Sequence, residues 1–199
     1  MVKKTDGGIL AATGYSVSSK RIGIKPTGEN RDLTLIKSDV PATVVGTFTR
    51  NIVKAAPVKW DMEVVQRGLA SAIVVNTGIA NAATGDEGYQ NCVREAAAVG
   101  KALEISSEEV LVASTGVIGP QIPIEKIEKG ISELSGNMSL DKAEAHEAAK
   151  AIMTTDTLPK EEAVEFEING KLCHIGAMCK GSGMIHPNMG TMLGFILSD

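Results

Sequence analysis

Residues 71–114 read SAIVVNTGIANAATGDEGYQNCVREAAAVGKALEISSEEVLVAS, and this stretch decides the class of fold. The compact apolar run over 71–76 is typical of a strand that is buried on both faces. A glycine-rich loop follows it, and apolar residues then recur with a helical period over about 87–103. Residues 109–114 form a second apolar run of the same kind. A buried strand, a helix and another buried strand together predict an α/β fold.

The same patterns extend outward from this stretch in both directions. Further strands are expected at 32–37, 43–49, 162–168, 171–178 and 191–197, and further helices at 61–69, 123–134 and 140–153. Asp61 and Asp86 are expected to cap helices, and Asn169-Gly170 is the typical turn of a hairpin. The elements lack the regular alternation of a Rossmann sheet, and no repeat or linker divides them. We therefore expect residues 1–199 to form one α/β unit of layered helices and mixed sheets.

The composition excludes several classes of function. The formal net charge is -4 and the basic residues are scattered, so no nucleic-acid partner is expected. No apolar run is long enough to span a bilayer, and the N-terminal residues make a poor signal peptide, so no membrane partner is expected. The three cysteines, Cys92, Cys173 and Cys179, form no C-x-x-C pair, and no histidine has a partner at metal-ligand spacing. The sequence predicts a cytoplasmic protein without a metal site.

The residues with the clearest chemistry lie in 180–195, which read KGSGMIHPNMGTMLGF. This glycine-rich loop leads to Thr191 at the start of an apolar strand. A threonine hydroxyl needs a base, and the α-amine of Thr191 would be one if the bond after Gly190 were broken. A free α-amine has a pKa near 8, suited to accepting a proton at neutral pH. By spacing alone, an ordinary turn before a strand with an internal threonine is the preferred explanation of this segment.

Two other segments carry hydroxyl groups, and the residues of the first could support acyl transfer. In 113–119 (ASTGVIG), Thr115 and Gly116 follow a buried strand and offer a hydroxyl and a backbone N–H to a developing oxyanion. In 154–157 (TTDT), the hydroxyls follow an alanine-rich helix. Without further information, a turn and a solvated helix end account for these two segments.

Together these segments resemble the ornithine acetyltransferase (glutamate N-acetyltransferase) family of arginine biosynthesis. The resemblance runs from about residue 7 onward, and 180–193 matches the family's self-cleavage motif, with Gly190 in place of the usual alanine. Residues 114–119 match its S-T-G-V-I-G segment at every letter, and 49–58 and 76–85 match two more of its segments.

The resemblance implies a role for each matching residue. The chain would cut itself between Gly190 and Thr191, and Thr191 would be the catalytic nucleophile. Thr115 and Gly116 would form the oxyanion hole. Thr154, Lys180 and Thr191 would contact the substrate, and the Lys180 ammonium would suit the α-carboxylate of an amino acid. The acetyl group would pass from N2-acetylornithine to glutamate through an acyl-enzyme, and some family members also accept acetyl-CoA as a co-substrate; no other cofactor is expected.

The resemblance also implies a fold and an assembly. The fold would be a self-processing fold similar to that of N-terminal nucleophile enzymes. Residues 1–190 would be the alpha half, residues 191–199 would begin the beta half, and a beta chain of the same precursor would complete the sheet. Two alpha and two beta chains, or more, would associate. Two alternatives are a self-processing amidase or aminopeptidase of similar fold, and an inert half that acts only as the partner of the beta chain.

Overall fold

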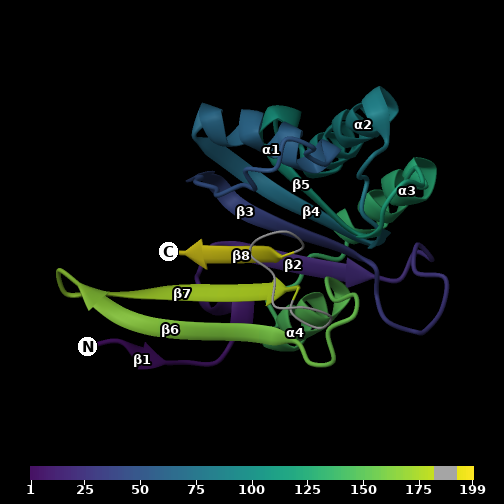
Figure 1. The fold of residues 1–199 in the computed structure, drawn as a ribbon. Helices are drawn as coiled ribbons and strands as arrows, with labels where there is room; N and C mark the ends of the chain where they lie inside the picture. Colours follow the sequence, from purple (N-terminus) through teal and green to yellow (C-terminus); the bar gives the residue numbers. More distant parts are fainter. Residues whose placement is uncertain (182–191) are drawn as a thin grey trace.

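The computed structural model describes residues 1–181 and 192–199, in which the central layer is a four-stranded sheet (Figure 1). Its strands, in the order β2-β3-β4-β5, are β2 (Tyr15–Lys20), β3 (Leu33–Thr43), β4 (Leu69–Ile79) and β5 (Val110–Val117). β4 and β5 are parallel and are joined through helix α2 (Gly85–Leu103), while the other pairs are antiparallel. The predicted strand, helix and strand over 71–114 are confirmed.

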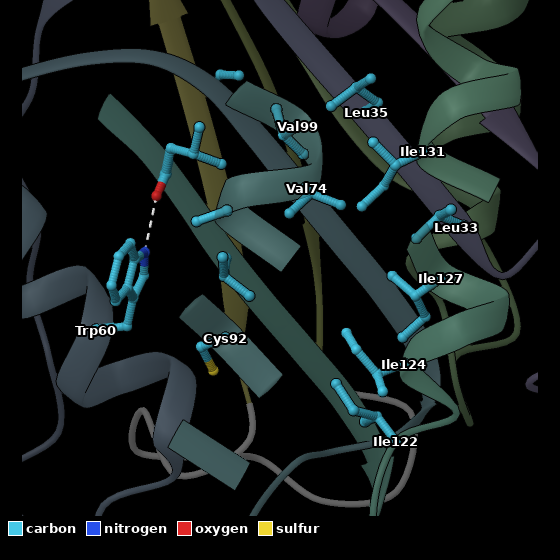
Figure 2. Close-up of a cluster of buried hydrophobic side chains, with 14 of the residues drawn as sticks. Leu33, Leu35, Trp60, Val74, Cys92, Val99, Ile122, Ile124, Ile127 and Ile131 are labelled. Atoms are coloured by element: carbon cyan, nitrogen blue, oxygen red, sulfur yellow. Dashed lines mark hydrogen bonds between the residues drawn. The ribbon is translucent and has the colours of Figure 1, made fainter. Parts of the chain in front are cut away.

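Three helices cover one face of this sheet. They are α1 (Ala56–Arg67), α2 and α3 (Ile124–Ser135), and a short 3-10 helix, η2 (Ser107–Glu109), precedes β5. Figure 2 shows the core between these helices and the sheet, where Val74 and Leu33 of the strands lie beside Ile131 of α3. The Trp60 indole N–H donates to the Val110 carbonyl over 2.8 Å, which ties α1 to β5 without leaving a buried donor unpaired.

A second layer covers the other face. It contains the 3-10 helix η1 (Gly8–Ala11), helix α4 (Lys142–Ala151) and a second sheet, with strands β1 (Lys3–Lys4), β6 (Lys160–Ile168), β7 (Lys171–Lys180) and β8 (Leu193–Ser198) in the order β1-β6-β7-β8. Ile36 and Val75 of the first sheet pack here with Ala148 of α4 and Met178 of β7. Because both faces of the central sheet are covered, β4 and β5 are apolar along most of their length.

The hairpin expected in the second sheet is confirmed. β6 and β7 pair antiparallel, and Asn169 (φ 51°) and Gly170 (φ 78°) form the turn between them. Two successive positive φ angles are the geometry that an Asn-Gly pair provides. The predicted helices at 123–134 and 140–153 correspond to α3 and α4.

Three local predictions are wrong. The strand expected at 43–49 does not form, because β3 ends at Thr43 and residues 44–49 are not part of a strand. Asp61 does not begin a helix: α1 starts at Ala56 with proline in its first turn, and Asp61 lies inside it. Asp86 likewise lies within the first turn of α2, whose cap position is Thr84. Among the helices of the described residues, none combines the length and apolar character needed to cross a membrane.

Candidate active site

Thr115 and Gly116 lie near the end of β5, beside the matching part of β4. The parallel register sets Thr115 next to Thr77 and Gly116 next to Gly78. A Cβ atom on Gly116, whose φ is 135°, would lie 2.2 Å from the carbonyl carbon of Gly78. Only glycine permits this approach of the two strands. The predicted glycine therefore has a demonstrable steric role.

Lys180 meets Thr115 from the second sheet. Its ammonium donates a hydrogen bond to the Thr115 hydroxyl oxygen over 3.0 Å, and both residues are buried, at 4% and 8% exposure. An ammonium can only donate, so the hydroxyl oxygen acts as the acceptor and its own proton remains available for another acceptor. Two residues that are 65 positions apart in the sequence are thus brought into direct contact.

The surroundings of Lys180 influence its charge. Burial lowers the pKa of Lys180, the Asp156 carboxylate opposes this, and the charge of Lys160 adds to the lowering. The Lys160 ammonium also donates directly to Asp156. Lys180 is therefore a buried amino group with a carboxylate nearby, and in its protonated form it is suited to holding an anionic group of a ligand.

The segment 154–157 is attached to the same place through Asp156. This carboxylate is buried and accepts a hydrogen bond from the Gly181 N–H over 3.1 Å, next to Lys180 in the chain. Thr154, which precedes it by two residues, is exposed to solvent. The structure therefore joins the Thr154 segment to the Lys180 end of β7, and no hydrogen bond links the Thr154 and Thr115 side chains among the described residues.

Gly190 and Thr191 lie outside the described residues. On the C-terminal side of them, Leu193 begins β8 and pairs with Lys180 of β7. The chain that follows Thr191 is therefore held at the lysine that contacts Thr115. The predicted roles of Gly190 and Thr191 remain predictions.

Two residues of this region were not predicted from the sequence. Asp156 is the third letter of the T-T-D-T segment, but nothing in that spacing indicates its bond to Gly181. Thr77 is fully buried beside Thr115, and its hydroxyl has no hydrogen-bond partner among the described residues. Within the same part of the chain, no group of three histidine, cysteine or acidic residues is placed to hold a metal ion.

Comparison with known proteins identifies the family. The model of the ArgJ family matches residues 16–199. The chain belongs to the ArgJ family. It is 50% identical over 194 residues to the arginine biosynthesis bifunctional protein ArgJ of Thermosynechococcus vestitus, an alignment that covers 97% of this chain and 46% of the relative. ArgJ of Lactococcus lactis is 46% identical, with 100% of this chain and 48% of the relative covered. The chain thus spans about half the length of the curated relatives it matches.

Two solved structures have the same fold. The crystal structure of arginine biosynthesis bifunctional protein ArgJ from Bacillus halodurans superposes with a TM-score of 0.89 at 37% identity, covering 97% of this chain and 98% of that one. Ornithine acetyltransferase of Mycobacterium tuberculosis, solved in complex with ornithine, gives a TM-score of 0.84 at 34% identity, covering 97% of this chain and 100% of that one. The family resemblance and the α/β fold with mixed sheets that were predicted from the sequence are confirmed.

Proposed function

We propose that this chain contributes half of the active site of an acetyltransferase of arginine biosynthesis, which moves the acetyl group from N2-acetylornithine to glutamate. The observation that carries the proposal is the hydrogen bond from Lys180 to Thr115, which unites two of the predicted site segments in one buried position. Membership of the ArgJ family supports the proposal, as does the likeness to an ornithine acetyltransferase that binds ornithine.

The proposed reaction begins with self-cleavage, in which one water molecule is consumed as the peptide bond between Gly190 and Thr191 breaks, leaving a carboxylate on Gly190 and a free α-amine on Thr191. The Thr191 hydroxyl oxygen then attacks the acetyl carbonyl carbon while that amine takes its proton. The negative charge that develops on the carbonyl oxygen is stabilised by the Thr115 hydroxyl and the Gly116 N–H. The carbon–nitrogen bond of the donor breaks, the departing nitrogen takes a proton, and ornithine leaves an acetyl ester on Thr191.

The second half of the cycle reverses this chemistry with another amine. The amino group of glutamate attacks the ester carbonyl, and the Thr191 oxygen leaves with a proton. Both ornithine and glutamate carry an α-carboxylate, which is the group that we assign to the Lys180 ammonium. Thr154 is assigned a second contact with the substrate. Acetyl-CoA as a further donor and a cytoplasmic location remain predictions from the sequence.

We also propose that the beta chain, which would begin at Thr191 and contribute β8, extends the second sheet beyond β8 with further strands. Among the described strands, β8 pairs with β7 alone and lies at the edge of its sheet. Ile196 on this edge is 72% exposed, and an apolar edge strand is a natural place for another strand to pair. An assembly of two alpha and two beta chains, or a larger one, is part of the same proposal.

Incubation of the protein, expressed from its complete reading frame, with N2-acetylornithine and glutamate tests the proposed reaction. The expected products are N-acetylglutamate and ornithine in equal amounts. Release of acetate without acetylation of glutamate would instead indicate a hydrolase and would overturn the proposal. A protein that leaves N2-acetylornithine unchanged would overturn it as well.

A further inference from the structure

The loop between β2 and β3 is built around a buried carboxylate. Asp32 is fully buried and accepts three backbone hydrogen bonds, from the N–H groups of Ile22 (2.6 Å), Ile24 (2.7 Å) and Lys25 (3.0 Å). A carboxylate that binds several backbone N–H groups fixes the path of a loop. The position of Lys25 is therefore determined by Asp32.

The side chain of Lys25 joins this loop to helix α4. Its ammonium donates to the carbonyl of Arg31 over 2.9 Å and to the carbonyl of Ala151 over 3.1 Å. Ala151 is the last residue of α4, where backbone carbonyls lack helical partners and carry partial negative charge. Thr154 follows only three residues later. Lys25 thus holds the point from which the Thr154 segment leaves the helix.

The same loop also contacts the other parts of the candidate site. Ile24 packs on Gly78 so closely that a Cβ there would lie 2.9 Å from the Ile24 Cγ2 atom, and Gly78 is the neighbour of Gly116. Burial lowers the pKa of Lys25, the Asp32 carboxylate opposes this, and the charge of Lys180 adds to the lowering. The influence of Lys180 places the two ammonium groups within electrostatic reach of each other.

We infer that Lys25 is a positioning residue, which holds the Thr154 segment in register with Thr115 and Lys180 so that the acetyl donor contacts all three. The inference rests on the proposed function, because Thr154 is a substrate contact only under that proposal. Lys25 acts through the Ala151 carbonyl and the backbone that follows it. No contact between Lys25 and the substrate is required.

An ordinary helix cap is the simpler explanation, and it makes different predictions. If Lys25 only caps and stabilises α4, substitutions of Lys25 and of Thr154 change KM independently of each other. A positioning residue makes them dependent, because the contribution of Thr154 to binding is lost once its segment is no longer held. A double-mutant cycle measures this dependence directly.

The test uses the protein expressed from its complete reading frame with Lys25→Met, Thr154→Ala, both changes together, and Lys126→Met as a control on the exposed face of α3. We expect Lys25→Met to raise the KM for N2-acetylornithine about tenfold, with a smaller effect on kcat. In the Thr154→Ala background the same change should raise KM less than about twofold. Lys25→Arg, which keeps a charge and several donors, should restore KM to within about threefold.

Hydrogen exchange over residues 152–159 gives a readout that does not depend on activity. We expect Lys25→Met to speed exchange in this segment about tenfold or more while α3 is unaffected, and Lys25→Arg to leave it unchanged. If Lys25→Met does not fold, Lys25→Gln, which retains a donor, takes its place. The inference would be overturned if Lys25→Met left the exchange rate of residues 152–159 unchanged. It would also be overturned if Lys25→Met raised KM by the same factor in the presence and absence of Thr154→Ala. An unmodified protein that transfers no acetyl group would refute the proposed function, and the exchange measurement would then still decide whether Lys25 holds residues 152–159 in place.

Discussion

At the scale of single residues, the Thr115 hydroxyl oxygen accepts a hydrogen bond from Lys180. The same hydroxyl is the proposed donor to the oxyanion. Thr115→Val keeps the shape of the side chain and removes both roles. We expect kcat for acetyl transfer to fall by about 10²–10³, the usual cost of removing one oxyanion donor. Steady-state rates at saturating N2-acetylornithine measure this. Thr115→Ser, which keeps the hydroxyl, should stay within about tenfold of the unmodified protein, and a Thr115→Val protein of normal kcat would exclude Thr115 from the oxyanion hole.

Gly116 provides a second test at the same scale, this time of stability. Gly116→Ala would place a methyl group 2.2 Å from the Gly78 carbonyl carbon and would force β4 and β5 apart. We expect a loss of about 3 kcal/mol or more in the free energy of unfolding, since a buried clash joins the strain of a positive φ. Gly119→Ala is the matched control, because φ there is 108° but no atom lies within 4 Å of the added Cβ. Equal thermal midpoints for the two variants would contradict the close approach of the strands.

The site was predictable from the sequence at those residues whose local motif is specific. Thr115 and Lys180 were named from motifs, and the structure brings them into contact. The carboxylates of Asp156 and Asp32 were missed, because each binds backbone N–H groups of a segment that the sequence does not place beside it. Lys25 was missed for the same reason: its acceptor Ala151 is 126 positions away.

At the scale of secondary-structure elements, helices α1 and α2 carry an unusual pair of acidic residues, Asp61 and Glu95. Glu95 of α2 is fully buried and neither carboxylate oxygen has a hydrogen-bond partner among the described residues, while Asp61 of α1 accepts from the Val112 N–H over 2.8 Å. Burial raises the pKa of each to about 8, and for Glu95 the Asp61 charge adds to the rise. Both groups are therefore largely protonated in the folded protein at neutral pH.

This pair makes the stability of the protein depend on pH. The folded state holds protons that the unfolded chain releases above its ordinary carboxyl pKa values, so the free energy of unfolding falls as pH rises from about 5 to about 8 and levels off above that. We expect Glu95→Gln, which is neutral at every pH, to reduce this fall by about half. Thermal midpoints across this range measure the effect. Glu87→Gln on the exposed side of the same helix should leave the slope unchanged, and an identical slope in Glu95→Gln would show that Glu95 is ionised in the fold.

The elements themselves were predicted best where local pattern and tertiary packing agree. The apolar runs at 71–76 and 109–114 form strands because both faces of the sheet are covered. The β-branched run at 44–49 has equal strand propensity but no partner: β3 shifts register between Lys37 and Ala42, and Val44 instead bonds to the Gly68 carbonyl beyond α1. Strand pairing depends on which segments lie side by side in the whole sheet, and the strand propensity of a local segment does not predict this.

At the scale of the whole molecule, the layers on the two faces of the central sheet determine the position of the candidate active site. The first sheet supplies Thr115 and Gly116, the second supplies Lys180, and the β2–β3 loop and the end of α4 meet beside them (Figure 1). The layered α/β architecture was predicted from periodicity, but the packing of β7 on the first sheet was not. A contact between segments so distant in sequence leaves no local pattern.

Self-cleavage before Thr191 is the central claim about the whole molecule, because the proposed nucleophile acts through the α-amine that cleavage creates. The most direct measurement is the intact mass, under denaturing conditions, of the protein expressed from its complete reading frame. We expect two chains, one ending at Gly190 and one beginning at Thr191, and the second chain should gain the mass of one acetyl group when N2-acetylornithine is added and the reaction is quenched rapidly. A single uncut chain, or a cut chain that never carries an acetyl group, would contradict the account.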